Sequence, residues 1–286
     1  MIRLFASDLD GTLLNLTHSL DGAIRAAIRE VTDSGAHFAI ATGRTMGSNG
    51  DYGFEGLGVE AIASNGALIF DRDGRLIKHS VMDPAFLEEM FRAFPQVCFE
   101  CVGVGRSYVM GSMEEQQAGF DQGSPAKRLL MRGMSMRRAE MQAMCSFDQT
   151  PEDVLAHEIC KVNARVTDPA IEAELHAFLA EHADSVVNTP FDPVMFEISG
   201  IDTNKGSAVA WLAGYLGCSE DEVAVYGDGG NDVAMLERFE HSYATSNARD
   251  EAKEAASEVI GPCALHAVPR HMVRTIHSQR AYTQIE

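Results

Sequence analysis

The stretch FASDLDGTL, Phe5–Leu13, joins a short apolar run to two aspartates and a glycine. An apolar run that ends in carboxylates is typical of a buried strand whose C-terminal end reaches the ligand-binding edge of an α/β sheet. Asp8 and Asp10 are two residues apart, so on a strand both side chains point to one side. Two carboxylates this close repel each other unless a cation lies between them or one is protonated. A hard divalent cation such as Mg²⁺ would meet that need, although a DxD alone is equally typical of a solvated acidic turn.

The pattern after this stretch predicts a strand–helix–strand unit. Apolar spacing indicates a helix over residues 20–34, capped by Ser19, and a second short strand over residues 37–41 that ends at Thr42. Such units are right-handed and build a parallel sheet, so the ends of both strands should lie on the same edge. The glycine-rich residues 45–58 predict a loop or a poorly formed helix.

Later segments predict a change of architecture and then a return to the first one. Residues 59–79 are expected to form a strand and a β-hairpin, and residues 83–190 a separate α+β module with an antiparallel sheet. Residues 111–150 give no firm assignment. From Asn204, which can cap a helix, the strand–helix rhythm resumes, and a strand ends at Gly227–Asp232, with the sequence GDGGND.

Composition restricts the classes of function. The chain has 286 residues and a formal net charge of −19, which argues against nucleic acid or an anionic membrane as a partner. No stretch approaches the ~20 apolar residues of a membrane span, and no export signal is recognisable. Six cysteines in a chain of this length do not form a dense disulfide framework, so we expect reduced thiols and a cytoplasmic protein.

The motifs together are more informative than any one of them. Lys205 alone is most simply a solvated lysine at a helix start, and Asp228 or Asp232 could merely favour a helix N-terminus. All of them, with Asp8 and Thr42, nevertheless fall at the ends of elements that one parallel sheet would bring together. The sequence therefore predicts one site at that edge.

The order DxDGTL, Thr, Lys and GDxxND resembles the haloacid dehalogenase-like (HAD) superfamily of phosphatases, and the module between the second and third motifs, with SNGA at Ser64–Ala67, is similar to the Cof-type subgroup with a large α/β cap (type IIB). The resemblance implies a Rossmann-like parallel-sheet core at residues 1–82 and 191–286, with an inserted α+β cap at residues 83–190. Two segments depart from the family pattern. Residues 244–248 read ATSNA where the family usually has a glycine-containing turn, and residues 45–58 replace a regular helix.

Charge and the resemblance together imply the roles of the site residues. Asp8 would be the nucleophile, Asp10 the general acid and base, and Lys205 the fixed positive charge that stabilises the transition state. Mg²⁺ would be held by Asp8, the backbone carbonyl of Asp10, and Asp228. The phosphoryl oxygens would be bound by the remaining groups: Thr42, Lys205, Asn231 and backbone N–H groups near Leu9 and Gly43. Asp232 is expected to orient Lys205 or a metal-bound water, and Arg44 either contacts substrate or braces its loop.

The expected function is hydrolysis of a small phosphorylated metabolite, most simply a sugar phosphate, through an aspartyl-phosphate. A phosphomannomutase-like phosphotransferase is the alternative enzyme, and a non-catalytic metabolite- or protein-binding module is a third possibility that the complete set of acids disfavours. The basic tract between residues 127 and 138 could attract an anionic substrate or be a solvated helix face. The sequence does not name the substrate or the oligomeric state.

Overall fold

The structure, a computed structural model, describes residues 1–15, 17–120, 144–190 and 195–283. The chain divides into two compact units, one made of Met1–His79 with Asp202–Glu286 and the other of Ser80–Ile201. The basic tract at residues 127–138 lies outside the described residues. Among the helices that are described, none is both long and apolar enough to cross a membrane.

The first unit is built on an eight-stranded sheet in the order β14-β13-β12-β1-β2-β3-β4-β5. Its parallel strands are β1 (Leu4–Ser7), β2 (His37–Ala41), β3 (Glu60–Ala63), β12 (Val223–Gly227), β13 (His241–Thr245) and β14 (Glu258–Ile260). The antiparallel strands β4 (Leu68–Phe70) and β5 (Leu76–His79) continue the sheet beyond β3, as the expected hairpin. The prediction of an α/β fold with a parallel sheet is confirmed.

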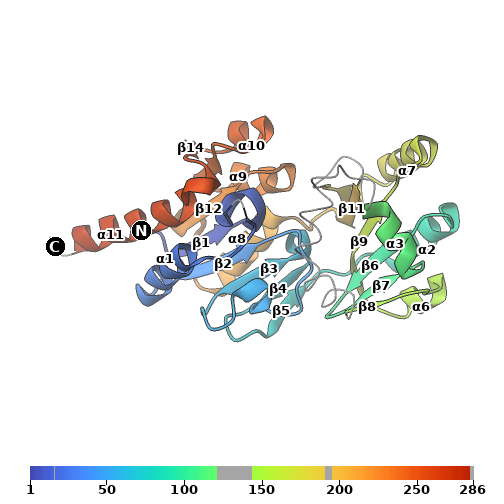
Figure 1. Cartoon of the computed structure of the whole chain (residues 1–286), viewed down its shortest axis with the longest axis horizontal. Coiled ribbons are helices and arrows are strands. Elements are labelled where there is room, and N and C mark those ends of the chain that lie inside the picture. Colours follow the sequence, from blue (N-terminus) through green and yellow to red (C-terminus); the bar gives the residue numbers. More distant parts are fainter. Residues whose placement is uncertain (16, 121–143, 191–194, 284–286) are drawn as a thin grey trace. The chain divides into compact units, whose positions relative to one another are not determined.

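Helices cover both faces of this sheet (Figure 1). On one face, α8 (Lys205–Tyr215), α9 (Val233–Arg238) and α10 (Asp250–Ala255) share a buried apolar cluster with alternate strand residues such as Leu4 and Val225. On the other face lie α1 (Gly22–Asp33) and α11 (Ala267–Thr283), and His271 of α11 is hydrogen-bonded to the buried Tyr226 of β12. Burial on both faces accounts for the nearly continuous apolar runs of these strands.

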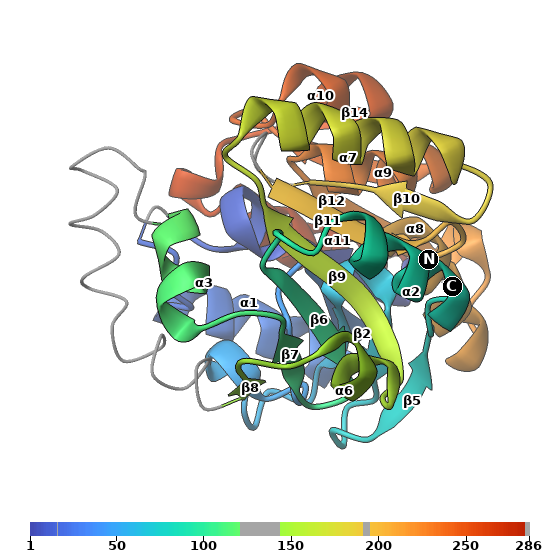
Figure 2. The same cartoon turned by 90° about the vertical axis from the view of Figure 1, so that its right-hand side faces the viewer.

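The second unit contains a six-stranded sheet in the order β10-β11-β9-β6-β7-β8. The strands are β6 (Phe99–Gly103), β7 (Ser107–Val109), β8 (Cys145–Ser146), β9 (Ile159–Arg165), β10 (Val186–Asn188) and β11 (Met195–Gly200). All pairs are antiparallel except β7 with β8. The helices α2 (Pro84–Ala93), α6 (Pro151–Leu155) and α7 (Pro169–Glu181) pack apolar side chains against one face of this sheet (Figure 2), and α3 (Met113–Phe120) follows β7.

The structure bears on three local expectations: the cap of the first helix, the bounds of the second unit and the conformation of residues 45–58. The first helix starts at Gly22 and is capped by Asp21, whose carboxylate accepts from the N–H groups of Ala23 and Ile24; the prediction of Ser19 as the cap is wrong. The second unit extends beyond the expected 83–190, because β11 pairs with β9 and β10 in its sheet. Residues 45–58 form no regular helix beyond one short turn, η2 (Asp51–Gly53), as their glycines predict.

Candidate active site

Three parallel strands of the first unit end at predicted site residues. Asp8 follows β1, Thr42 follows β2 and Asp228 follows β12, and these strands are neighbours in the order β12-β1-β2. After β1 the chain turns sharply through η1 (Leu9–Leu13), where Gly11 has a φ of +84°. A Cβ on Gly11 would lie 2.2 Å from an oxygen of Asp228, so only glycine lets the two motifs approach this closely.

Lys205 lies at the centre of the charged groups. Its Nζ donates to Oδ1 of Asp8 and to Oδ1 of Asp232, at 2.7 Å in each case. The side chain is 0% exposed, although Lys205 is the first residue of helix α8, directly after the capping residue Asn204. Because its side chain is fully buried between two carboxylates, Lys205 is not the solvated lysine that its sequence context alone suggests.

Asp228 and Asp232 complete an acidic cluster with Asp8. Carboxylate oxygens of these three residues lie within 4.8 Å of one another. Asp228 accepts from the hydroxyl of Thr12 at 2.8 Å. The second oxygen of Asp232 accepts from the backbone N–H groups of Asp228 and Gly229, both at 2.9 Å. Asp232 is thus engaged through both oxygens, whereas Asp8 and Asp228 retain capacity for a cation.

The electrostatics of the cluster reflect its excess of negative charge. Burial raises the pKa of Asp8 well above its usual value, and Asp232 and Asp228 add to the effect against the lowering influence of Lys205. Burial and Asp232 raise the pKa of Asp228 to about 6. Burial alone would lower the pKa of Lys205, but Asp232 and Asp8 outweigh it and raise the pKa, so the lysine stays cationic. One cation for three carboxylates leaves a site that a further cation would stabilise.

Asp10 faces a different set of partners. Arg44 donates to Oδ2 of Asp10 through Nε at 2.6 Å and to Oδ1 through its terminal nitrogen, and Nδ1 of His18 lies 2.9 Å from Oδ1. Burial would raise the pKa of Asp10, but the hydrogen bonds and charge of Arg44, helped by His18, lower it. The guanidinium of Arg44 also lies over the ring of Tyr52, 4.6 Å from its centroid. Arg44 thus contacts both Asp10 and Tyr52, and no motif in the sequence marks His18 or Tyr52.

The other predicted residues gather around Thr42. Thr42 is 1% exposed, its hydroxyl accepts from the N–H of Arg44 at 3.1 Å, and its carbonyl accepts from the N–H of Asn65 at 3.0 Å. Asn231 donates to the side chain of Asn65 at 3.1 Å. A Cβ on Gly43 would lie 2.8 Å from Asn65 Oδ1, so these side chains converge on Gly43. The site thus gains Asn65, which the SNGA segment signals only as a family feature.

The unusual ATSNA segment supports the first motif without a glycine. Thr245 and Asn247 both donate to the carbonyl of Gly11, at 3.2 and 2.8 Å. Leu9, which follows Asp8 and begins the turn η1, has a fully buried side chain. The structure therefore brings together Asp8, Thr12, Lys205, Asp228 and Asp232, with Asp10 held beside them by Arg44.

The match to a family model settles the class of protein. The model of haloacid dehalogenase-like hydrolases matches residues 5–271, and the chain belongs to this family. The family resemblance inferred from the motifs is thereby confirmed, as is the prediction that the chain is an enzyme, a phosphoric monoester hydrolase.

Three curated relatives that match over nearly their whole length are phosphatases. A phosphatase of Bacillus subtilis that acts on 5-amino-6-(5-phospho-D-ribitylamino)uracil is 26% identical and covers 90% of this chain and 89% of its own. A second Bacillus subtilis phosphatase is 27% identical, over 96% and 99%. An HMP-PP phosphatase of Yersinia enterocolitica is 25% identical, over 97% of each.

Solved structures share the fold. A haloacid dehalogenase-like hydrolase from B. subtilis superposes with a TM-score of 0.81 at 25% identity, over 95% of this chain and 99% of its own. A sugar phosphatase of HAD subclass IIB gives a TM-score of 0.75 at 20% identity, over 96% and 98%, a likeness that concerns the fold alone.

Proposed function

We propose that this protein is a Mg²⁺-dependent phosphatase that hydrolyses a small phosphorylated metabolite, most simply a sugar phosphate, through an aspartyl-phosphate. The observation that carries the proposal is the buried Lys205 between Asp8 and Asp232, with Asp228 beside them. The named substrates of relatives, such as a phosphoribitylamino-uracil, support the substrate class.

The donor set suits a hard divalent ion. Mg²⁺ would be held by the carboxylates of Asp8 and Asp228 and by the backbone carbonyl of Asp10. The raised pKa values of Asp8 and Asp228 support this assignment, because burial and, to a smaller extent, the neighbouring carboxylates disfavour both charged forms, a cost that a cation would relieve. When bound, the ion supplies charge neutralisation for the incoming phosphate dianion. Asp232, engaged by Lys205 and two N–H groups, would orient the lysine.

The side chains of the protein divide the remaining work. Asp8 would attack phosphorus, and Lys205, already fixed at 2.7 Å from it, would stabilise the charge that spreads over the phosphoryl oxygens. Thr42, Asn231 and N–H groups near Leu9 and Gly43 would bind those oxygens.

Asp10 would act as general acid and then as general base. Its ion pair with Arg44 favours the carboxylate, which suits the base that later activates water. To donate a proton to the leaving oxygen first, Asp10 has to release Arg44 and take up a proton. We infer that Arg44 keeps Asp10 ionised while the two side chains are paired, and that Asp10 takes up a proton when the pair separates.

We propose that the unit Ser80–Ile201 acts as the cap that selects the substrate, since the motif residues all belong to the other unit. The six cysteines, all in the described part of the chain, form no disulfide, and we infer a reducing, cytoplasmic environment.

Phosphate release tests the proposal. Purified protein is assayed on an aryl phosphate and on a panel of phosphorylated metabolites, with Mg²⁺ and with excess EDTA. We expect turnover to inorganic phosphate with Mg²⁺ and none with EDTA, and poor support by Ca²⁺, whose looser coordination would misplace the nucleophile. Full turnover in EDTA would contradict the metal dependence. Transfer of the phosphoryl group to a sugar instead of water would favour a phosphotransferase.

A further inference from the structure

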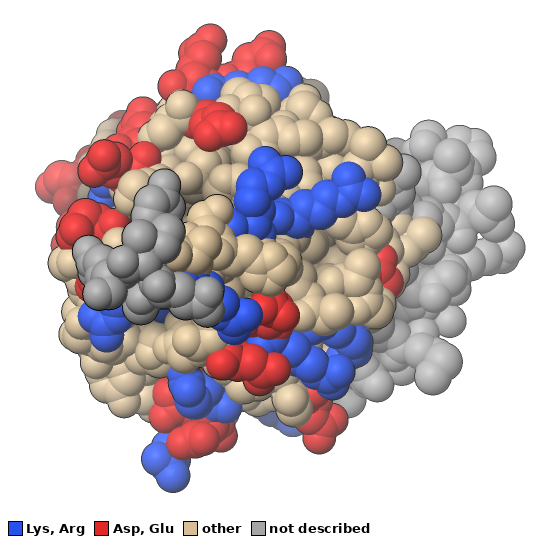
Figure 3. All heavy atoms as spheres, turned by 90° about the vertical axis from the view of Figure 1, so that its left-hand side faces the viewer, with Lys and Arg blue, Asp and Glu red and all other residues tan. Residues whose placement is uncertain are grey.

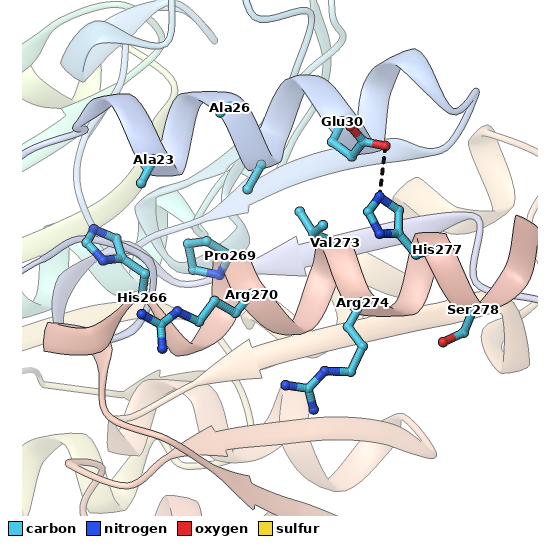
Figure 4. Close-up of a pocket in the computed structure, with 11 residues that line it drawn as sticks. Ala23, Ala26, Glu30, His266, Pro269, Arg270, Val273, Arg274, His277 and Ser278 are labelled. Atoms are coloured by element: carbon cyan, nitrogen blue, oxygen red, sulfur yellow. Dashed lines mark ion pairs between the residues drawn. The ribbon is translucent and has the colours of Figure 1, made fainter.

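A groove separates the two helices on one face of the first sheet. Helices α1 and α11 pack beside each other, and the space between them, about 660 Å³, is open to solvent. Its apolar lining consists of Ala23, Ala26 and Ala27 from α1 and Pro269 and Val273 from α11 (Figure 4). Like small-molecule sites, the groove combines an apolar lining with a few polar groups that could orient a ligand.

The helix on one side of the groove belongs to a segment without acidic residues. Residues 259–285 contain three arginines and three histidines but no Asp or Glu, although Asp and Glu make up 42 of the 286 residues of the chain. At that frequency, 27 residues would contain about four acids. On the side of the molecule seen in Figure 3, some Lys and Arg groups lie among uncharged surface and others lie beside Asp and Glu. The segment therefore creates a local positive region on an acidic protein.

Most cations along the groove already have carboxylate partners. At one end, His266 lies 2.7 Å from Asp21; at the other, Glu30 pairs with His277 at 3.4 Å and with Arg280 at 2.6 Å. Arg270 and Arg274, which line the middle of the groove, are exposed and have no ion pair within the described part of the chain. Figure 4 shows both side chains extending from α11 on the side away from α1.

Helix stability does not account for these two arginines. Arg270 is the fourth residue of α11, where the helix dipole disfavours positive charge, whereas Arg274 lies beyond the first turn and outside this effect. They are also four residues apart, a spacing at which like charges repel each other along a helix. An anion bound beside both guanidinium groups would remove both costs, and long arginine side chains can turn toward the groove to reach it.

We propose that this groove binds a small organic anion, with its carboxylate, sulfonate or phosphate head on Arg270 and Arg274 and its apolar body on the alanines, Pro269 and Val273. A small monoanion fits better than an acidic protein, because each further negative charge on a ligand meets the repulsion of a chain with a net charge of −19. The site shares no residue with the acidic cluster and does not depend on the proposed function.

The test uses the full chain and 8-anilinonaphthalene-1-sulfonate, an apolar sulfonate, with the uncharged N-phenyl-1-naphthylamine as its comparison. Isothermal titration gives the affinity, and methyl NMR of Ala23, Ala26 and Val273 locates the ligand. We expect one saturable site, and a loss of at least about tenfold in sulfonate affinity for Arg270→Gln/Arg274→Gln, since both charge-assisted contacts are removed. The affinity of the uncharged probe should change less than twofold.

Two further variants separate a built site from general electrostatics. Arg75→Gln/Arg92→Gln changes the net charge equally, from −19 to −21, at exposed arginines that do not line the groove, and should keep the native sulfonate affinity. Ala26→Trp should fill the groove and weaken both probes, with thermal unfolding confirming that the fold is kept. Equal losses in the two double variants, unchanged binding in Ala26→Trp, or unshifted groove methyl groups would each overturn the proposal.

Discussion

Each of the two units buries a lysine that forms ion pairs with carboxylates. In the second unit, Lys161 of β9 is 1% exposed and forms an ion pair with Glu197 of β11 at 2.6 Å. In the first unit, Lys205 is 0% exposed and faces Asp8 and Asp232, with Asp228 close by. A buried ion pair can serve the fold alone, whereas an excess of buried negative charge is stable only if another cation joins it. We infer that this excess of buried negative charge marks the proposed active site.

The largest effect should come from Asp8, the carboxylate that we propose attacks phosphorus. Asp8→Asn keeps the shape of the side chain but removes the nucleophile, so we expect kcat to fall at least about 10,000-fold. The fold should persist, because Asp232 still pairs with Lys205. Initial rates with an aryl phosphate and a circular dichroism spectrum measure both. Near-native turnover by this variant would rule out an aspartyl-phosphate.

Removal of Lys205 should affect activity and stability together. Lys205→Met should lower kcat about 100- to 1,000-fold, as loss of a preorganised charge does, and should cost about 3–5 kcal/mol because buried carboxylates lose their cation. Mg²⁺ should offset part of the stability loss, so the deficit in unfolding free energy should be larger in EDTA. Denaturant unfolding in the two buffers measures this. Unchanged stability would mean that Lys205 is solvated, as its position at a helix start suggested.

Removal of the buried lysine of the second unit, Lys161, should lower stability in a way that does not depend on Mg²⁺. Lys161→Met should cost about 3 kcal/mol by leaving Glu197 buried, with no difference between Mg²⁺ and EDTA. Lys161→Met/Glu197→Leu should recover most of that loss, because apolar side chains replace both charges. Denaturant unfolding of the single and double variants gives the coupling. A Mg²⁺-dependent deficit at Lys161 would remove the distinction between the two lysines.

The sequence predicted the strand ends better than the contacts among them. Spacing in DxDGTL, the Asn204 cap and GDGGND placed Asp8, Lys205 and Asp228 correctly at one sheet edge, because parallel topology makes local patterns converge. Spacing does not report burial, so Lys205 looked solvated. Local propensity also could not separate Ser19 from Asp21 as a helix cap, nor reveal that His18, with a φ of +51°, turns back to Asp10. The extent of the second sheet depends on the long-range pairing of β11 with β9, which no local pattern specifies.

The smallest effect concerns Asp21, whose carboxylate has hydrogen-bond partners at both oxygens. Burial alone would raise its pKa, but hydrogen bonds from His266, the N–H of Ile24 and Asn15 lower the pKa to about 2. Since this value is below that of the unfolded chain, about 4, Asp21 stabilises the fold above pH 4, and the contribution is lost as the pH falls toward 2.

Asp21→Ala should therefore lower the unfolding free energy by about 1 kcal/mol at pH 7, the usual value of an N-cap, and by progressively less below pH 4. Ser19→Ala is the matched control at the position that the sequence suggested, and should change stability by less than about 0.5 kcal/mol at any pH. Denaturant unfolding of the three proteins from pH 7 to pH 2.5 gives both curves. If Ser19→Ala were the more costly change, or if the Asp21→Ala deficit did not shrink in acid, the capping contacts of Asp21 would not be what stabilises α1. In that case the ionised carboxylate of Asp21, despite its hydrogen-bond donors, would add no more to the stability of the fold than the buried carboxylates Asp8 and Asp228 do.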